Sequence, residues 1–154
     1  MRPVIFQYKE FEKNSYYPIA ELGVGGVEKW RKIDAYVDSG ATLSVFASVE
    51  ADRLGLKFKE GKKRYLGGIG GKSIPVYVHR LKVQLGPHKF HANLGFSDEM
   101  GVGFNLLGRE DFFSRFDVTF SDAHRQLTFQ PIKGKSKTGG KSILTVAKRK
   151  RKAY

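Results

Sequence analysis

The chain has 154 residues, about the length of one domain, and a formal net charge of +13. It is 40% hydrophobic and 13% aromatic, which is enough apolar side chain to bury a core and excludes a wholly disordered chain. It contains no cysteine, which excludes disulfide frameworks, thiolate metal sites and cysteine nucleophiles.

The positive charge is concentrated at the C-terminal end. Residues 133–154 hold nine of the 28 Lys and Arg residues and no acid, so residues 1–132 carry 19 basic against 15 acidic side chains. The end segment is rich in Gly, Ser and Lys, and it buries too little apolar surface to offset its ordering entropy. We therefore predict one folded domain over residues 1–132 and a disordered basic tail over residues 133–154.

The sequence also predicts the cellular location of the protein. Residues 1–12 carry charged side chains where a secretion signal needs an apolar stretch. No run of about 18 apolar residues occurs anywhere in the chain. We expect a soluble, cytoplasmic protein.

Short apolar or alternating runs recur between turn signals along residues 1–132, and this pattern is typical of an all-β domain. The strands are predicted at residues 4–8, 17–22, 33–37, 74–78, 81–85, 90–96, 118–120 and 126–129. Residues 121–124 have the composition of a hairpin turn between the last two strands.

Two segments are predicted as short helices. Residues 47–54 contain a candidate N-cap, Ser48, and an acid in the first turn, Glu50, and a glycine follows them. Residues 109–116 place three phenylalanines at helical spacing.

The first segment with possible chemistry is residues 35–41, which read Ala-Tyr-Val-Asp-Ser-Gly-Ala. An apolar strand here ends directly in Asp38, Ser39 and Gly40. A carboxylate at a strand end can act as an acid or a base. The tripeptide alone is also a common turn sequence, so both interpretations stay open.

The second segment is residues 66–73, Leu-Gly-Gly-Ile-Gly-Gly-Lys-Ser. It is not a phosphate-binding P-loop, because that motif needs a glycine where Leu66 stands and a helix after the lysine. The flanking sequence is strand-like on both sides, which favours a mobile hairpin tip whose backbone N–H groups can approach a ligand. A plain flexible hairpin is the alternative.

The third segment is residues 105–111, Asn-Leu-Leu-Gly-Arg-Glu-Asp. Two bulky apolar residues before a glycine are typical of a buried strand. Glu110 and Asp111 then suit the positive end of a helix that starts there. Taken alone, this segment indicates packing.

In this order, the three segments resemble the retropepsin-like aspartic proteases, the single-domain relatives of pepsin that include the retroviral proteases. The resemblance spans residues 33–129, and the segments correspond to the catalytic loop, the flap tip and the stretch before the family's helix. Retroviral members commonly carry an acid where this chain has Thr42, so Arg109 lacks that partner. The chain therefore looks closer to the cellular and prokaryotic members.

The resemblance implies an all-β fold, a closed β-barrel of the retropepsin type with one or two short helices. It also implies an aspartic endopeptidase that acts as a homodimer on peptide or protein substrates, because the chain contains one Asp-Ser-Gly and the chemistry needs two carboxylates. Like carboxylates that share a site cannot both ionise cheaply, so they share one proton. One then activates water while the other donates to the developing oxyanion.

The resemblance also assigns roles to individual residues. The catalytic residue is Asp38, the active-site support is Ser39, Gly40, Ala41 and Arg109, and the substrate-binding flap is Gly67, Gly68, Ile69, Gly70 and Gly71. The family implies that the Ser39 hydroxyl bonds across the dimer and that the Ile69 N–H faces the substrate. Candidate pocket walls are Val37, Ala41, Val76 and Leu107, each of which also suits an ordinary core.

Two other functions stay open. A non-catalytic peptide-binding or scaffolding dimer of the same fold needs neither Asp38 nor a mobile glycine tip. A protein tethered to nucleic acid is suggested by the basic run, which can release counterions from phosphates. That run is Lys148, Arg149, Lys150, Arg151 and Lys152.

We predict no metal site and no cofactor. His88 and His91 have a spacing that suits a metal on a helix, but they lie in a strand-like stretch bounded by Gly and Pro. His79 and His124 are remote in sequence, and surface histidines are far more common than ligands.

Overall fold

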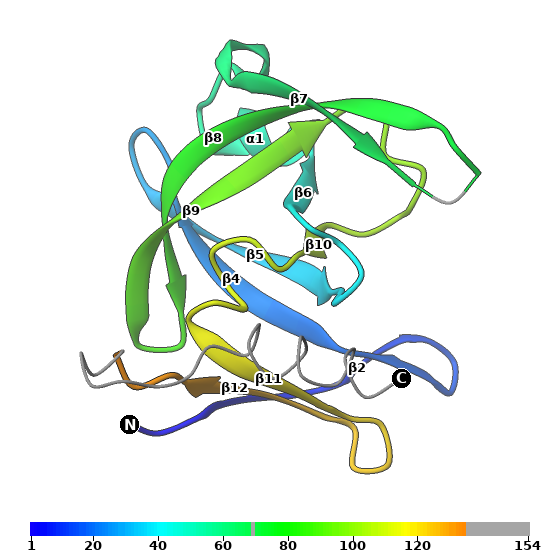
Figure 1. The fold of residues 1–154 in the computed structure, drawn as a ribbon, viewed down its shortest axis with the longest axis vertical. Coiled ribbons are helices and arrows are strands. Elements are labelled where there is room, and N and C mark those ends of the chain that lie inside the picture. The colour runs from blue at the N-terminus through cyan, green and yellow to red at the C-terminus, as the bar shows by residue number, and fades with distance from the viewer. Residues whose placement is uncertain (69, 135–154) are drawn as a thin grey trace, which may run out of the picture.

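The computed structural model describes residues 1–68 and 70–134, and Figure 1 shows the course of the chain. Most of the described residues lie in strands, with one short α-helix and one 3-10 helix among them. The elements are β1 (Val4–Gln7), β2 (Lys9–Glu12), β3 (Ser15–Tyr17), β4 (Ile19–Gly25), β5 (Trp30–Val37), β6 (Ser44–Ala47), α1 (Ser48–Arg53), η1 (Phe58–Glu60), β7 (Lys62–Gly67), β8 (Ser73–Leu85), β9 (His88–Ser97), β10 (Leu106–Leu107), β11 (Phe116–Ser121) and β12 (Gln126–Pro131).

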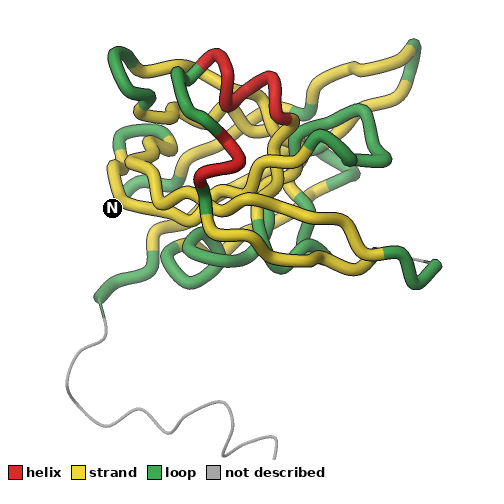
Figure 2. Tube along the Cα trace, turned by 90° about the horizontal axis from the view of Figure 1, so that it is seen from above, coloured by secondary structure: helices red, strands yellow, loops and turns green. Residues whose placement is uncertain are grey.

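The largest sheet has seven strands in the order β4-β5-β10-β6-β9-β8-β7. It also closes on itself, because β4 pairs with β8 through Gly23 opposite Gln84 and Val24 opposite Val83. Six strands therefore form a ring, while β7 extends from β8 as the outer arm of a hairpin. Figure 2 shows the arms of this hairpin reaching beyond the body of the fold.

The core follows from the alternation of side chains along the strands. On β4, Leu22 and Val24 are buried, and on β5 Ile33, Ala35 and Val37 are buried, while the residues between them are more exposed. Each large apolar side chain buried in this way contributes about 1.5–3 kcal/mol to folding. The ring is thus filled by one face of its strands.

A three-stranded sheet, β1-β12-β11, lies below the ring in the view of Figure 1. Its inner face is aromatic: the Phe129 ring meets Phe6 with centroids 5.9 Å apart and Phe116 with centroids 5.8 Å apart, both edge to face. Such contacts add to the burial of the rings themselves. They attach the N-terminal and C-terminal strands of the domain to the main core.

A second, smaller apolar cluster lies on the side of the ring that carries the hairpin. Leu43, Val45 and Val76 are buried in it. Partly buried side chains pack against them: Leu66, Ile74, Val78 and Met100. This cluster packs the β7–β8 hairpin, as far as the Leu66–Ile74 pair next to its tip, against Leu43 and β6.

The mostly β fold class is confirmed, and so are the predicted strand regions. The runs at residues 74–78 and 81–85 belong to a single strand, β8, because His79 and Arg80 continue its pairing with β9. The buried strand indicated at residues 105–111 is β10, and the strand-like sequence before the glycine-rich tip is β7, whereas the sequence prediction missed β2, β3, β6 and η1. These elements are short or polar, so they carry little of the alternating apolar signal.

One predicted helix is present and the other is not. Residues 47–54 contain α1, although its N-cap is Ala47 and no side chain caps it, so the Ser48 cap was wrong. Residues 109–116 form turns instead of a helix. Asp111 interrupts them with a φ of 66°. Its carboxylate accepts a bond from the Asn93 N–H at 2.8 Å, a tertiary contact that overrides the helical spacing.

The predicted domain, residues 1–132, lies within the described part of the chain apart from Ile69, whereas most of the predicted tail does not. The last strand ends at Pro131, and the placement of the domain boundary at residue 132 stays a prediction. The tail from residue 135 onward lies outside the described residues, as does Ile69. Within the described part of the chain, no helix is long and apolar enough to cross a membrane.

Candidate active site

Asp38 lies at the point where β5 leaves the ring. Its backbone N–H donates to the Leu107 carbonyl at 3.0 Å, and the N–H of Val37 donates to the Pro18 carbonyl at 2.9 Å. Val37 is buried, whereas Asp38 is half-buried. The strand therefore ends with its last apolar side chain in the core and the following carboxylate at the surface.

The loop after β5 folds back onto the Asp38 carboxylate. The Gly40 N–H donates to Asp38 Oδ1 at 2.8 Å, and the Ala41 N–H donates to the Asp38 carbonyl at 3.2 Å. A Cβ at position 40 would lie 3.2 Å from Oδ1, so glycine suits this close approach. A backbone N–H aimed at a carboxylate fixes its orientation.

A short strand, β10, lies between β5 and β6, the two strands that this loop connects. Leu106 and Leu107 pair in parallel with β5, and Leu106 pairs antiparallel with Val45 of β6. The Gly108 N–H then donates to the buried Ser44 hydroxyl at 2.9 Å. A Cβ at position 108 would come within 2.6 Å of the Leu43 carbonyl carbon. Only glycine fits here, and the two chain segments meet backbone to backbone.

The contact between the two segments continues beyond Gly108. The Arg109 N–H donates to the Ala41 carbonyl at 2.9 Å, and the Glu110 N–H donates to the Thr42 carbonyl at 2.8 Å. Residues 38–42 are therefore bonded along their length to residues 107–110. This arrangement limits how far the Asp38 loop can move.

The glycine-rich segment forms the tip of the β7–β8 hairpin. The ladder ends with Gly67 opposite Ser73, and the Gly68 N–H donates to the Lys72 carbonyl at 3.1 Å. Gly70 and Gly71 have φ values of 94° and 77°, which favour glycine. A Cβ at any of the four described glycines would meet nothing within 4 Å. The tip therefore stands clear of the rest of the described chain.

Two ion pairs connect the hairpin arms to the loop after β10. Arg64 on β7 lies 3.1 Å from Glu110, and Arg80 on β8 lies 3.3 Å from Asp111. Sequence reasoning placed both acids at a helix start and missed these partners. Pairs that are partly exposed contribute up to about 1 kcal/mol each to stability. Their larger effect here is to fix the hairpin relative to the segment that contacts the Asp38 loop.

The other predicted site residues lie around the loop, but not all of them bond to it through side chains. Ser39 and Arg109 are exposed, and both line a shallow groove of about 620 Å³ with Gly40 and Thr42. Within residues 1–68 and 70–134, the Arg109 guanidinium makes no ion pair, consistent with the threonine at position 42.

The candidate pocket walls separate into two kinds. Val37, Val76 and Leu107 are at most 1% exposed, so they are core residues. Ala41 is half-buried beside the loop and stays a candidate wall.

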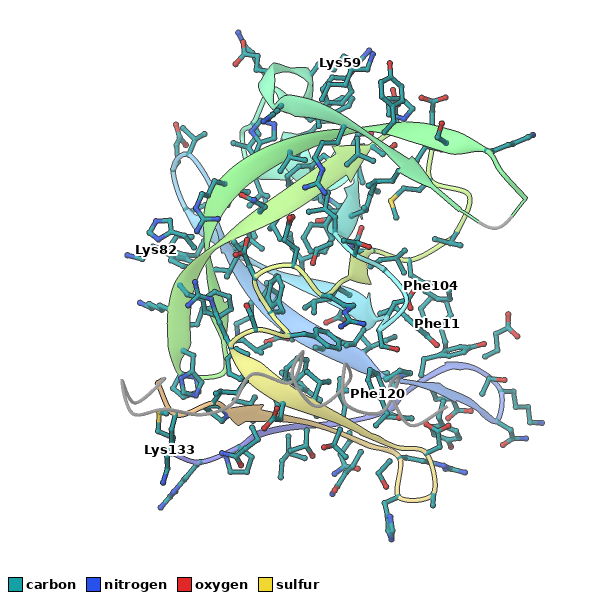
Figure 3. The ribbon with its side chains drawn as sticks, in the orientation of Figure 1. Phe11, Lys59, Lys82, Phe104, Phe120 and Lys133 are labelled. Carbon is teal, nitrogen blue, oxygen red and sulfur yellow. The ribbon has the colours of Figure 1, made fainter. Side chains whose placement is uncertain are left out.

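A tyrosine beside Asp38 escaped the sequence analysis. Burial, and next the negative charge of Asp38, raises the pKa of Tyr36 above its ordinary value. The Tyr36 ring belongs to an aromatic cluster with Tyr17, Phe11 and Phe104, and Figure 3 shows Phe11 and Phe104 next to each other. A second groove runs from Asp38 along Tyr17 and Tyr36. The alternation along β5 gives the only sequence signal for Tyr36, which points away from the buried residues on either side.

The part of the chain that the structure describes contains no group of three His, Asp or Glu residues that could hold a metal ion. Of the histidines considered in the sequence, His79 instead bonds through Nε2 to the Phe58 carbonyl at 2.8 Å.

The comparisons with known proteins agree with this geometry. The model of a family described as aspartyl protease matches residues 20–110. The chain is similar to the crystal structure of a retropepsin-like aspartic protease from Rickettsia conorii, with 19% identity, a TM-score of 0.62 and coverage of 83% of this chain and 89% of that chain. It is also similar to the EIAV protease complexed with the inhibitor HBY-793, with 17% identity, a TM-score of 0.48 and coverage of 66% and 88%. No curated protein matches the sequence.

Proposed function

Because the chain belongs to the aspartyl protease family, whose model matches residues 20–110, we propose that it is an aspartic endopeptidase with an active site shared between two copies. The observation that carries this proposal is the Asp38 loop. Its carboxylate stands half-buried at a strand end, accepts the Gly40 N–H at 2.8 Å and is supported by the backbone of β10. A carboxylate that is held in one orientation in this way is suited to acid–base chemistry.

A second copy is needed because peptide hydrolysis by this chemistry uses two carboxylates. The chain contains one Asp-Ser-Gly sequence, so the second carboxylate is Asp38 of another copy. The loop is at the surface, with Ser39 and Gly40 exposed, which leaves it free to meet its counterpart. Ser39 is then in place to donate a hydrogen bond across the dimer and hold the two loops together.

The two carboxylates share one proton, because two like charges in one site repel each other strongly. The ionised carboxylate takes a proton from a water molecule as the water oxygen forms a bond to the scissile carbonyl carbon. The protonated carboxylate donates its proton to the carbonyl oxygen. Collapse of this tetrahedral species breaks the C–N bond: the carboxyl that received the water proton gives it to the leaving nitrogen, and the other carboxylate takes a proton from a hydroxyl of the tetrahedral species, which restores the pair. No covalent enzyme intermediate is involved.

The β7–β8 hairpin acts as the flap over an extended peptide. A Cβ at Gly67, Gly68, Gly70 or Gly71 would meet nothing within 4 Å, so no other part of the described chain packs against the tip and it is free to move. Its arms are fixed at the base by Arg64 and Arg80. The role of the Ile69 N–H toward substrate stays a prediction, since Ile69 lies outside the described residues. Arg109 supports the catalytic loop through its own backbone N–H.

Cleavage of a peptide library across pH by wild type and Asp38→Asn tests this function, with sedimentation to follow the dimer fraction of both. We expect cleavage that is favoured at acidic pH, where the pair holds one proton, and its loss in Asp38→Asn with the dimer retained. Asp34→Asn is the matched control, because Asp34 lies on the same strand and its side chain is half exposed beside Lys9. A well-folded wild-type dimer that cleaves nothing would contradict the proposal and leave peptide binding as the function of the fold.

A further inference from the structure

A patch of aromatic and basic side chains lies on the outer surface of the ring, formed by strands β5, β4, β8 and β9. Neighbouring strands place outward-facing positions side by side here, because Gly25 pairs with Trp30, Gly23 with both Lys32 and Gln84, and Gln84 with Lys89. We call this patch the Trp30 face. Its members are Gly23, Gly25, Trp30, Lys32, Lys82, Gln84, Lys89 and His91.

The indole of Trp30 lies against bare backbone. A Cβ at Gly23 would be 3.7 Å from Trp30 Cε3, and a Cβ at Gly25 would be 3.6 Å from Trp30 Cζ2. The two glycines therefore leave room for the ring to rest on β4. Even so, the residue is 43% exposed. A large aromatic ring that is supported from beneath and open to solvent is suited to stacking against a flat ligand.

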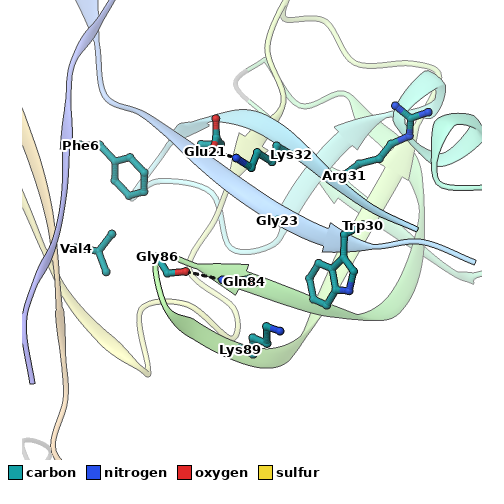
Figure 4. A pocket seen from close by; sticks show the side chains of 10 residues that line it. All are labelled: Val4, Phe6, Glu21, Gly23, Trp30, Arg31, Lys32, Gln84, Gly86 and Lys89. Atoms are coloured by element: carbon teal, nitrogen blue, oxygen red, sulfur yellow. Dashed lines mark hydrogen bonds and ion pairs between the residues drawn. The ribbon is translucent and has the colours of Figure 1, made fainter. Parts of the chain in front are cut away.

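Positive charge surrounds this ring. Lys89 Nζ lies over the ring, 5.5 Å from its centroid, and Lys32, two residues on along the same strand, forms an exposed ion pair with Glu21 at 3.7 Å. Figure 4 shows Trp30, Lys89 and Lys32 around one groove of about 440 Å³, with Glu21 as the acid beside Lys32. Lys82 continues the basic surface along β8, and Figure 3 shows it pointing outward.

Single-stranded nucleic acid fits this combination of groups. An exposed base stacks on an aromatic ring, while lysines spaced around the ring reach the phosphates on either side and release counterions. A duplex fits less well because its bases are already stacked on one another. An acidic peptide would use the lysines, but it would stack on the indole only where an aromatic residue stands beside its acids, whereas every nucleotide carries a base.

The last described strand, β12, borders this groove. Val4 lines the same groove and pairs with Phe129 of that strand. Residues 135–154 then carry eight Lys and Arg residues and no acid. We propose that the Trp30 face binds single-stranded nucleic acid, with a base stacked on Trp30 and phosphates held by Lys32, Lys82 and Lys89.

Trp30 is the single tryptophan of the chain, so its fluorescence reports on this face alone. The full chain is titrated with an oligothymidylate of about 15 nucleotides, within the site sizes known for single-strand binders. We expect saturable quenching that weakens as salt rises. Trp30→Ala, followed by the anisotropy of a labelled oligonucleotide, should weaken binding at least about fivefold, the lower end for loss of one base–aromatic stack, and Trp30→Phe should keep most of it.

A double lysine variant separates the face from the tail. Lys32→Gln with Lys89→Gln should reduce the slope of log K against log salt by roughly 1.4, because each phosphate contact to a single strand contributes about 0.7. The control, Lys57→Gln with Lys59→Gln, removes the same charge from exposed residues near η1 and should leave the slope unchanged.

Two results would overturn the proposal. In one, the oligonucleotide binds but Trp30 is not quenched and the two double variants behave alike, which would leave the tail as the binding element. In the other, the Trp30 signal responds to vesicles that contain phosphatidylserine and not to the oligonucleotide, which would make the face a membrane contact.

Discussion

Gly108→Ala changes the contact between the Asp38 loop and β10. The added methyl group would lie 2.6 Å from the Leu43 carbonyl carbon, 2.7 Å from the Leu43 oxygen and 2.8 Å from the Ala41 oxygen. All three are backbone atoms of the segment that carries the Asp38 loop, so they cannot turn aside as a side chain would. The segments must separate to accept the methyl group.

The cost follows from two effects. Overpacking of a tight site costs about 1–3 kcal/mol. Separation also weakens the bond between the Gly108 N–H and the buried Ser44 hydroxyl, and an unsatisfied buried donor costs about 1–3 kcal/mol. We therefore expect Gly108→Ala to lower the free energy of unfolding by about 2–5 kcal/mol. This is a large part of the about 5–15 kcal/mol typical of whole domains.

Urea unfolding at a fixed protein concentration, followed by circular dichroism, measures this change. With a urea m-value of about 1–3 kcal/mol/M, the midpoint should fall by at least about 0.7 M. Gly68→Ala is the control, because its methyl group meets nothing within 4 Å and should change stability by less than about 0.5 kcal/mol. Equal midpoints for the two variants would refute the reasoning about this contact.

Two further changes test other parts of the structure. Arg64→Gln removes the ion pair with Glu110, so stability should fall by no more than about 1 kcal/mol, while KM for peptide cleavage should rise several-fold because the hairpin loosens. The control is Lys63→Gln, a change at the neighbouring residue of β7, which should leave KM unchanged. Equal KM values for both variants would count against the role of the ion pair. Burial, and next the hydrogen bond to Asp122, raises the pKa of Tyr8 to about 12 from 10.0. Because the pKa is raised in the folded state, the stabilisation is complete below the ordinary value and is lost as pH rises toward 12. The difference in unfolding free energy between wild type and Tyr8→Phe should therefore shrink over that range, and a difference that stays constant would show that Tyr8 is not the group responsible.

The parts of the site that are local in sequence were predictable. The strand before Asp38, the loop at Gly40 and the glycine-rich hairpin each depend on residues that are neighbours in the chain. The retropepsin-like resemblance that they supported is confirmed by the family match. Their order along the chain gave the resemblance its specificity, since each segment alone has an ordinary structural explanation.

The parts that depend on distant residues were not predictable. Asp111 was expected in a helix, but its carboxylate bonds to the N–H of Asn93, 18 residues away, and the backbone turns with it. Ser44 resembles an isolated polar residue in an apolar run, and its role depends on Gly108, 64 residues away. The pattern of residues within a single strand does not indicate such distant hydrogen-bond partners.

The Trp30 face, on the outer side of the sheet, also depends on residues that are distant in sequence and was therefore not predictable. On β4, Gly23 and Gly25 weaken the strand signal, and nothing in that strand indicates which ring covers them. The ring that covers these glycines is determined by the register between β4 and β5, which places Trp30 opposite Gly25. Register between strands follows from the assembled sheet.

The sharing of one active site by two copies is tested most directly by mixing wild type with Asp38→Asn at constant total protein and measuring cleavage. If each site needs Asp38 from both copies, activity follows the fraction of wild-type dimers and falls to roughly one quarter in an equal mixture of freely exchanging subunits. Activity that falls only to about one half, in proportion to the wild-type protein, would show that a single copy is sufficient and would contradict the shared site.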